Sequence, residues 1–340
     1  MADLFADPQV PRRSMTAAEI GRRFQEAEAR FDDMAEAAFE HQREWSPTYR
    51  RFAAGHKWSD WTTAPFLPVE AFKWPGIIDS KSQRPEVVFS SSGTGGKQSR
   101  HPVIDLSIYE RSVVAHFEEV FGGGAFRIAA HLPTYRRSGE TSSLLHMVDL
   151  LMRRSGTPES GSALDEAEFD EILCRKGNED APVMVFGTAF GLLDMVEKRS
   201  WRLPPTAVVV ETGGMKTYRR NIARRDLHER LAEGFGITRD RVMSEYGMCE
   251  LLSQCYTRGG EIYYPPSWMR FRVVDVEDPD REVEGGYTGL LALFDLANLH
   301  SVSAILTSDL AIQRSGGFEL VGRADAAEIR GCNFLVQPDQ

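Results

Sequence analysis

The clearest candidate for chemistry is a short run of hydroxyl-bearing residues, glycines and a lysine, Phe89-Ser-Ser-Ser-Gly-Thr-Gly-Gly-Lys97, placed just after the β-like Val87-Val88. Glycines let backbone N–H groups approach an anion, and serine, threonine and lysine add donors, so the run suits a phosphate. It is not a Walker A loop, because that motif requires glycine and a hydroxyl residue where this chain has Ser91 and Gln98. Taken alone, a plain surface turn is the alternative.

Four later segments carry carboxylates, basic groups and closely spaced glycines. They are Glu211-Thr-Gly-Gly-Met-Lys216, Ser244-Glu-Tyr-Gly-Met-Cys-Glu250, Thr307-Ser-Asp309 and Gly322-Arg-Ala-Asp325. An enzyme that activates a carboxylate must hold ATP so that the acid attacks the α-phosphorus while pyrophosphate leaves. Positive and hydrogen-bonding groups must gather around the phosphates for this reaction.

In this order and approximate spacing, the loop and the four segments resemble the AMP-forming adenylating superfamily of acyl-CoA synthetases, adenylation domains and firefly luciferase. Within it, the chain most resembles the acyl-protein synthetase family of bacterial bioluminescence, the long-chain fatty acid to protein ligases. The narrower resemblance rests on Phe66-Leu-Pro-Val-Glu-Ala-Phe-Lys73, the Gly-Gly-x-Lys segment and Arg330-Gly-Cys332. It covers roughly residues 60 to 336. Each motif alone is weak, whereas their ordered combination is strong.

The resemblance implies a set of residues that bind ATP and AMP. The loop corresponds to the family's pyrophosphate-binding loop, and one tyrosine to the residue that stacks on adenine. An aspartate and an arginine correspond to the residues near the ribose hydroxyls. The implied set is Ser91, Ser92, Gly93, Thr94, Gly95, Lys97, Gly213, Gly214, Tyr246, Gly247, Met248, Asp309 and Arg323. Gly95 and Cys249 stand where the family usually has threonine, so the contacts of those two hydroxyls are not assumed.

The resemblance also implies a metal ligand and an acyl pocket. Glu250 corresponds to the glutamate that holds Mg²⁺ against the phosphates, and a carboxylate is a suitable ligand for that hard cation. His131 and Gly213 correspond to positions that line the acyl pocket. His131 ends an apolar run and equally fits a hydrogen-bonded core histidine. At Gly213 the missing side chain would allow close approach to the ligand.

A cysteine near the end of the chain is the implied acyl acceptor. In the acyl-protein synthetase family the enzyme's own cysteine takes the acyl group and passes it to a partner reductase, and Cys332 occupies the matching position. A partly ionised thiol is a competent nucleophile. Cys249 and Cys255 are rivals, and Cys174 is expected to be incidental. Because only a short tail, residues 331–340, follows Arg330, we expect no C-terminal lid domain and no lysine from one.

The elements that must position these groups follow from hydrophobic periodicity. Buried strands are predicted at residues 127–132, 183–187, 207–211 and 241–244, and helices between them at 106–121, 142–154, 188–199 and 221–235. This alternation predicts an α/β fold with largely parallel sheets covered by helices. Strand-like stretches at 268–276, 289–295 and 302–307 predict a mostly β C-terminal subdomain. A long amphipathic helix is predicted from Thr16 to Ala38.

Length and composition limit the domain organisation and the possible classes of protein. The 340 residues fit one large domain or two ordinary ones, here an N-terminal helical segment (1–60), an α/β core (61–260), a β-rich subdomain (261–330) and the tail. A net charge of −10 with dispersed arginine pairs argues against a nucleic-acid binder. The four cysteines form no C-x-x-C pair and no long apolar run occurs, which predicts a cytoplasmic protein without a membrane span.

Three functions are therefore open. The first is an ATP- and Mg²⁺-dependent ligase that adenylates a carboxylic acid, with fatty acids as the first candidates, and acylates Cys332 before transfer to an acyl reductase or another acceptor protein. The second is a CoA ligase of the phenylacetate type without its lid. The third is a nucleotide- or acyl-binding protein that has lost catalysis.

Overall fold

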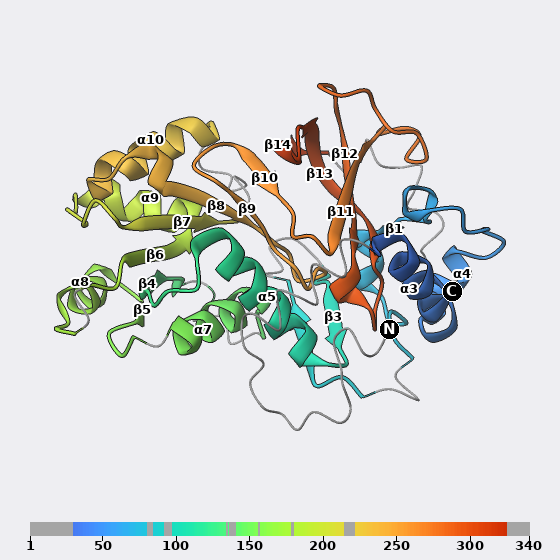
Figure 1. Cartoon of the computed structure of the whole chain (residues 1–340), viewed down its shortest axis with the longest axis horizontal. Coiled ribbons are helices and arrows are strands. Elements are labelled where there is room, and N and C mark those ends of the chain that lie inside the picture. The colour runs from blue at the N-terminus through green and yellow to red at the C-terminus, as the bar shows by residue number, and fades with distance from the viewer. Residues whose placement is uncertain are drawn as a thin grey trace. The chain divides into compact units, whose positions relative to one another are not determined.

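The computed structural model describes residues 30–79, 84–91, 97–133, 135, 141–155, 157–177, 180–213 and 222–324 (Figure 1). The chain divides into two compact units. Unit 1 comprises Met1–His116, Met248–Ser253 and Pro265–Gln340, and unit 2 comprises Phe117–Gly247 and Gln254–Tyr264. Each unit is thus built from separate stretches of sequence. The predicted boundaries at residues 60, 260 and 330 stay a prediction.

Unit 2 contains a sheet with strand order β10-β9-β8-β7-β6-β4-β5. The five strands from β8 to β5 are parallel, and β9 and β10 extend the sheet antiparallel. The strands are β4 (Arg127–His131), β5 (Gly161–Ala163), β6 (Val183–Thr188), β7 (Val208–Thr212), β8 (Val242–Tyr246), β9 (Cys255–Thr257) and β10 (Ile262–Tyr264). The predicted parallel sheet is confirmed.

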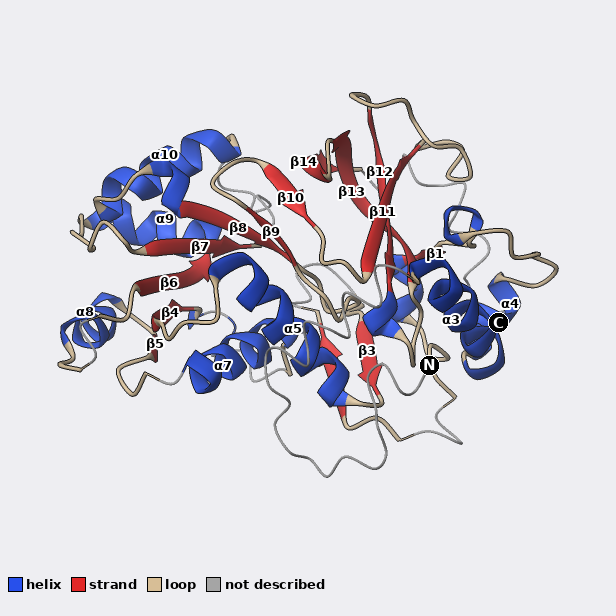
Figure 2. Ribbon diagram, in the orientation of Figure 1, coloured by secondary structure: helices blue, strands red, loops and turns tan. Residues whose placement is uncertain are grey.

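Helices cover this sheet, as the apolar runs of its strands require. Strand β7 is buried along its whole length, which is typical of a parallel strand covered on both faces. Helices α8 (Glu166–Cys174), α9 (Ala189–Lys198) and α10 (Arg224–Phe235) share one apolar core with the sheet. Helix α7 (Ser143–Ser155) lies against β4 (Figure 2). The four predicted helices all occur, and α5 (Leu106–Phe121) has the predicted bounds.

Unit 1 is built around an antiparallel meander of four strands, with β1 (Leu67–Pro68) parallel to its third strand. The strands are β11 (Met269–Val274), β12 (Thr288–Asp295), β13 (Ala304–Arg314) and β14 (Gly317–Arg323). The mostly β character predicted for this part of the chain is confirmed. A separate hairpin pairs β2 (Val87–Ser90) with β3 (Arg100–Val103), so the strand predicted at Val87 is present.

Short helices complete unit 1. They are α3 (Phe31–Trp45), α4 (Pro47–Phe52) and the 3-10 helices η1 (Trp61–Thr63), η2 (Val69–Lys73) and η4 (Leu296–Asn298), with η3 (Arg239–Arg241) in unit 2. Helix α3 packs on the meander through Phe31, whose ring lies 5.9 Å from that of Phe294. The first part of the predicted long helix, residues 16–29, lies outside the described residues.

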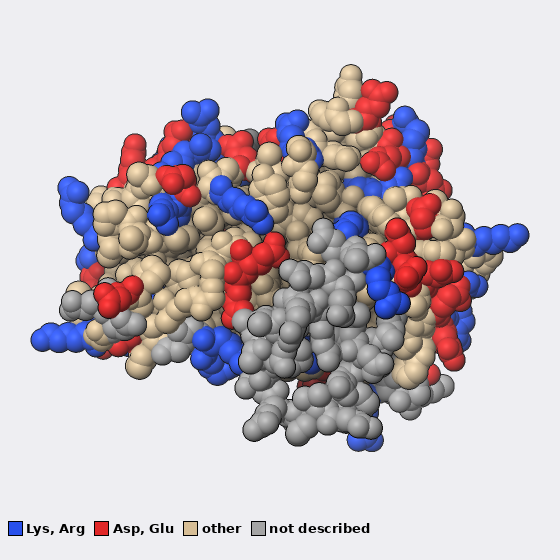
Figure 3. Space-filling model, viewed as in Figure 1, with Lys and Arg blue, Asp and Glu red and all other residues tan. Residues whose placement is uncertain are grey.

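The hydrophobic pattern of the sequence did not predict several elements, namely β3, β5, α8, β9, β10 and β14. Most are short, and β14 grades from buried to exposed along its length, so none shows a strong apolar period. Lysine and arginine side chains are intermixed with acidic ones on the face drawn in Figure 3. None of the helices in the described part of the chain combines the length and apolarity needed to cross a bilayer.

Candidate functional site

The base of the predicted phosphate loop closes the β2–β3 hairpin of unit 1. The backbone N–H of Ser91 donates to the carbonyl of Ser99 over 3.1 Å, and the N–H of Ser99 donates to the Ser91 hydroxyl over 3.0 Å. The loop therefore starts and ends at a paired position. Ser92, Gly93, Thr94 and Gly95 lie outside the described residues.

The lysine of this loop packs on Trp74, which directly follows the segment Phe66–Lys73. The Nζ of Lys97 lies 3.5 Å from the centre of the Trp74 ring, a cation–π arrangement. Trp74 is 37% exposed, so the lysine sits at a partly solvated surface rather than in the core. The structure thus joins the loop to the segment that precedes β2.

The second half of the Ser244–Glu250 motif belongs to unit 1, where a buried polar network holds its backbone. Asn298 donates through Nδ2 to the carbonyl of Glu250 over 2.8 Å and accepts at Oδ1 from the N–H of Leu252 over 2.9 Å. Asp295 accepts from the hydroxyl of Ser253 over 2.8 Å. Burial raises the pKa of Asp295 to about 6. These side chains fix the segment at several points, because buried polar groups need partners.

Glu250 is a buried carboxylate surrounded by groups that favour its ionised form. It is 6% exposed, and burial raises its pKa. Hydrogen bonds from the Ser99 hydroxyl and the Cys249 thiol, and the positive charge of Arg323, oppose that rise in pKa. No cluster of three or more potential protein ligands occurs among the described residues. A single carboxylate fits a Mg²⁺ that is shared with substrate phosphates rather than caged by protein.

Asp309 and Arg323 lie opposite each other on β13 and β14. Their Cα atoms are register partners, and the Nε of Arg323 is 3.4 Å from the Oδ1 of Asp309. The arginine side chain is 46% exposed and the aspartate 20%, so both can reach a ligand. The two residues predicted to approach one ribose are therefore neighbours in the structure.

In unit 2 the predicted residues gather at the carboxyl edge of the parallel sheet. Strand β4 ends at His131, β7 at Thr212 and β8 at Tyr246, and the register aligns these ends. Ligands of open α/β sheets bind outside this edge. His131 is 7% exposed, burial lowers its pKa, and its Nδ1 has no hydrogen-bond partner. Its side chain has a hydrogen bond with the backbone of Ala163, and its place in an acyl pocket stays a prediction beside the core-histidine interpretation.

Glu245, one residue before the motif tyrosine, is a buried carboxyl that the sequence did not single out. The hydroxyl of Thr212 donates to its Oε2, and the carboxylate of Glu211 lies near enough to act on it. Burial, reinforced by the charge of Glu211, raises the pKa of Glu245 to about 7. Its position within the motif Ser244–Glu250 was the available signal.

Glu211 itself joins β7 to its neighbours. The hydroxyl of Ser244 donates to Glu211, and the Nε2 of His228 lies 3.0 Å from Ser244 Oγ and 3.4 Å from Glu211 Oε1. Arg224 lies 3.6 Å from the same carboxylate oxygen. This buried network ties helix α10 to the strand that leads into the Gly-Gly segment.

Two glycines of the motifs occupy positions that disfavour a side chain, one because of its backbone conformation and the other because of the space around it. Gly213 has a φ of +94°, a conformation that residues with side chains rarely adopt. A Cβ at Gly247 would lie 2.5 Å from the Oε1 of Glu245. Tyr246 is buried, with its ring edge-on to Tyr263 at 5.9 Å. Gly214 lies outside the described residues.

The cysteines of the described residues are free thiols. Cys249 and Cys255 are buried, and burial raises the pKa of Cys249 well above its ordinary value. Cys174 is exposed at the end of α8, in unit 2. Because nucleophilic cysteines require an accessible thiolate, Cys249 and Cys255 are poor acyl acceptors. Cys332 lies outside the described residues.

The sequence motifs indicated polar candidate residues, which stay predictions, but not the residues that hydrogen-bond to them in the structure. Ser99 and Asn298 contact Glu250, and Asp295 contacts Leu252 just after the motif, only because the chain folds back on itself. For Ser99 no sequence signal was available, because the alternation of buried and more exposed residues from Ser99 to Val103 is a property of the folded strand.

Comparison with solved structures defines the class of fold. An open conformation of 2-hydroxyisobutyryl-CoA ligase, in complex with 2-HIB-AMP and CoA, matches 94% of this chain and 76% of its own, with a TM-score of 0.58 and 13% identity. ATP-bound MatB from Rhodopseudomonas palustris matches 69% of this chain with a TM-score of 0.50 and 14% identity, and there the chain spans 47% of the MatB chain. The protein has the fold of the N-terminal domains of AMP-forming adenylating ligases.

The family follows from the sequence model that matches residues 158–338, described as acyl-protein synthetase, LuxE. The match covers more than half of the chain, and the chain belongs to this family. No curated protein matches the chain significantly. The chain spans about half the length of the first solved structures that it matches.

Proposed function

We propose that the protein is an ATP-dependent ligase that converts a carboxylic acid, with fatty acids as the first candidates, into an acyl adenylate and then acylates its own Cys332. The observation that carries the proposal is the family match over residues 158–338. That range contains the whole Ser244–Glu250 motif as well as Asp309, Arg323 and Cys332.

In the first step a carboxylate oxygen of the acid attacks the α-phosphorus of ATP. The bond from the α-phosphorus to the bridging oxygen breaks, and pyrophosphate leaves with the bonding electron pair. The loop from Ser91 to Lys97, with Ser92, Gly93, Thr94 and Gly95, would bind the departing phosphates. Asp309 would accept hydrogen bonds from the ribose hydroxyls, and Arg323, 3.4 Å from Asp309, would approach the same sugar.

The remaining predicted residues would hold the base, the acyl group and the metal. Tyr246, Gly247 and Met248 would bind the adenine side, and Gly213, Gly214 and His131 would line the acyl side. Glu250 would hold Mg²⁺, which would neutralise charge on the phosphates as pyrophosphate forms. Its burial and its donors, Ser99 and Cys249, keep that carboxylate in one place.

In the second step the thiolate of Cys332 attacks the carbonyl carbon of the acyl adenylate. The carbon–oxygen bond to the phosphate breaks, AMP leaves, and a thioester remains on the enzyme. A partner protein, such as an acyl reductase, would then take the acyl group. The burial of Cys249 and Cys255 supports the choice of Cys332.

Intact mass spectrometry of the full chain after incubation with ATP, Mg²⁺ and a panel of acids tests the proposal. We expect one acyl adduct that depends on both ATP and acid, and its loss in Cys332→Ser with acid-dependent ATP–pyrophosphate exchange retained. An adduct that survives Cys332→Ser would refute self-acylation at this cysteine. Acyl-CoA formation by both proteins in a parallel incubation that also contains CoA would instead indicate a CoA ligase. ATP binding without exchange for any acid would indicate a binding protein.

A further inference from the structure

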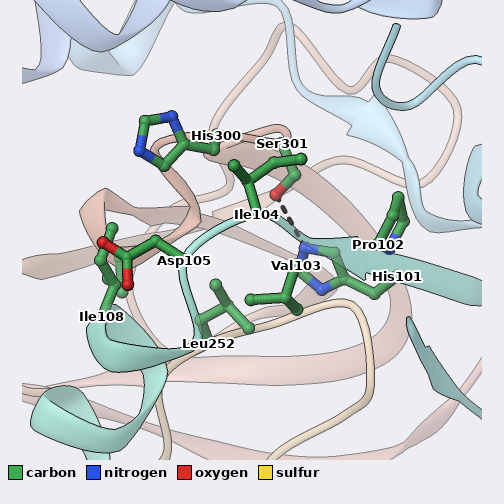
Figure 4. A pocket seen from close by; sticks show the side chains of 10 residues that line it. His101, Pro102, Val103, Ile104, Asp105, Ile108, Leu252, His300 and Ser301 are labelled. Carbon is green, nitrogen blue, oxygen red and sulfur yellow. Dashed lines mark hydrogen bonds between the residues drawn. The ribbon is translucent and has the colours of Figure 1, made fainter. Parts of the chain in front are cut away.

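His101 is a fully buried histidine whose two ring nitrogens both have partners within unit 1. It is 0% exposed and lies on β3, a short distance after the phosphate loop. Its Nδ1 is 2.8 Å from the carbonyl oxygen of Cys249, and its Nε2 is 2.8 Å from the hydroxyl of Ser301. Figure 4 shows the ring directed at Ser301 beside a small pocket.

The partners determine which nitrogen carries the proton. A carbonyl oxygen only accepts, so Nδ1 must donate to Cys249. In a neutral imidazole Nε2 is then an acceptor, and the Ser301 hydroxyl donates to it over 2.8 Å in preference to the Asn298 carbonyl, which lies 3.3 Å away. Burial lowers the pKa of His101 to about 4, which is consistent with a neutral ring at physiological pH.

Ser99, the residue just before β3, makes a second contact to the motif. Ser99 and His101 lie on the buried side of alternating residues, and the Ser99 hydroxyl hydrogen-bonds the carboxylate of Glu250. The Phe72 ring packs on the imidazole in a T-shaped arrangement with the ring centres 5.2 Å apart, which limits rotation of the imidazole. The strand that closes the phosphate loop is therefore tied to both Cys249 and Glu250.

We propose that His101 is a positioning residue for the Mg²⁺-dependent binding of ATP. By donating to the Cys249 carbonyl, it fixes the backbone from which the Glu250 carboxylate projects and sets that carboxylate relative to the phosphate loop. Because His101 is fully buried and both ring nitrogens have protein partners, this role requires no contact with nucleotide or acid. The inference rests on the proposed function, because it assumes that Glu250 and the loop act on one ATP.

Isothermal titration calorimetry of the full chain with ATP, in Mg²⁺ and in EDTA, tests this role. In His101→Asn the amide N–H occupies the place of Nδ1 and can still donate to Cys249. In His101→Gln the amide reaches the place of Nε2, and the contact with Cys249 is lost. Ser301→Ala is the matched control, because it removes the partner of Nε2 and a longer 3.3 Å contact to the Asn298 carbonyl, while the Asn298 side chain keeps its bonds to Glu250 and Leu252. Thermal unfolding of all variants measures the cost in stability separately.

We expect His101→Gln to weaken ATP binding in Mg²⁺ about tenfold while binding in EDTA stays at the wild-type level. His101→Asn and Ser301→Ala should bind ATP in Mg²⁺ nearly as the wild type does. The positioning role would be overturned if His101→Gln bound ATP in Mg²⁺ with wild-type affinity. It would also be overturned if both His101 variants lost the same affinity for ATP, because a residue that only fills space would not distinguish Asn from Gln. A wild-type protein that binds no ATP overturns the proposed function and this inference together, whereas binding without exchange overturns the ligase reaction only.

Discussion

Glu245 and Glu250 belong to one short motif, and both are buried carboxyl groups, yet their surroundings differ. Glu250, in unit 1, receives hydrogen bonds from Ser99 and Cys249 and the field of Arg323. Glu245, in unit 2, receives a hydrogen bond from Thr212 and the repulsion of Glu211. Burial raises the pKa of each, but only at Glu250 does a positive side chain oppose it.

The contrast teaches what each carboxyl group is suited to do. Hydrogen-bond donors and a nearby positively charged side chain stabilise the ionised form of a carboxylate, and this form can bind a metal ion. A carboxyl group beside another acidic side chain is stabilised in its protonated form. The same residue type, a few positions apart, therefore suits an electrostatic role in one unit and a neutral, structural role in the other.

The largest expected effect is on Glu250. Glu250→Gln should reduce acid-dependent ATP–pyrophosphate exchange by at least about 100-fold, because the amide is a poor replacement for an anionic Mg²⁺ ligand. Exchange measured over a range of Mg²⁺ concentrations checks this expectation. Glu245→Gln is the matched control and should retain most of the exchange. Similar losses in the two variants would remove the distinction between the carboxyl groups.

The next effect is the pH dependence of stability at Glu245. Its folded-state pKa of about 7 lies above the ordinary 4.5, so between these values the folded protein binds more protons than the unfolded one. The free energy of unfolding should therefore fall as pH rises through that window. Above pH 7 the loss should be complete and should reach about 3 kcal/mol.

Glu245→Gln should remove this penalty, since the amide oxygen can still accept from Thr212. Chemical unfolding of both proteins at several pH values checks the difference, which cancels the contributions of Asp295 and His101. A difference that does not change with pH would show that Glu245 is ionised in the folded protein.

A smaller effect is expected at the ribose pair. Asp309→Ala should raise the KM for ATP about tenfold or more, because hydrogen bonds to a charged group are lost, with little change in the KM for the acid. Glu319→Gln breaks the Arg314 ion pair at the other end of the same hairpin and is the control. If both variants raise the KM for ATP equally, the hairpin's integrity rather than the aspartate is responsible.

The smallest effect concerns Lys97. Trp74→Ala should raise the KM for ATP about two- to fivefold, since an exposed cation–π contact contributes about 0.5–1 kcal/mol to holding the lysine. Trp45→Ala, which changes the similarly exposed tryptophan of α3, should leave the KM for ATP unchanged. A lower KM in Trp74→Ala would show that the tryptophan restrains the lysine from its ligand.

Much of the fold could be predicted because strong apolar runs report burial directly. The strands around Val183 and Val208 and the helix at Leu106 follow from hydrophobic patterns in the sequence. The β9–β10 extension and β14 could not be predicted in this way. They are short or graded in exposure, and their pairing depends on neighbours distant in sequence.

The candidate site was predictable where residues act through their own chemistry. Asp309, Arg323 and Glu250 stood out as charged groups in ordered motifs. The residues that support them did not, because a buried serine, asparagine or histidine has no distinctive local pattern. His101 illustrates this, since its contacts to Cys249 and Ser301 join positions far apart in the chain.

The sequence by itself determined the parallel sheet of unit 2, the β-rich character of unit 1 and the family resemblance, because periodicity and ordered motifs are properties of neighbouring residues. Only the tertiary structure decided which carboxyl group is surrounded by donors and which lies beside another acid. Electrostatic environment depends on distance in space and on burial. The folded chain alone places Arg323 near Glu250 and Glu211 near Glu245.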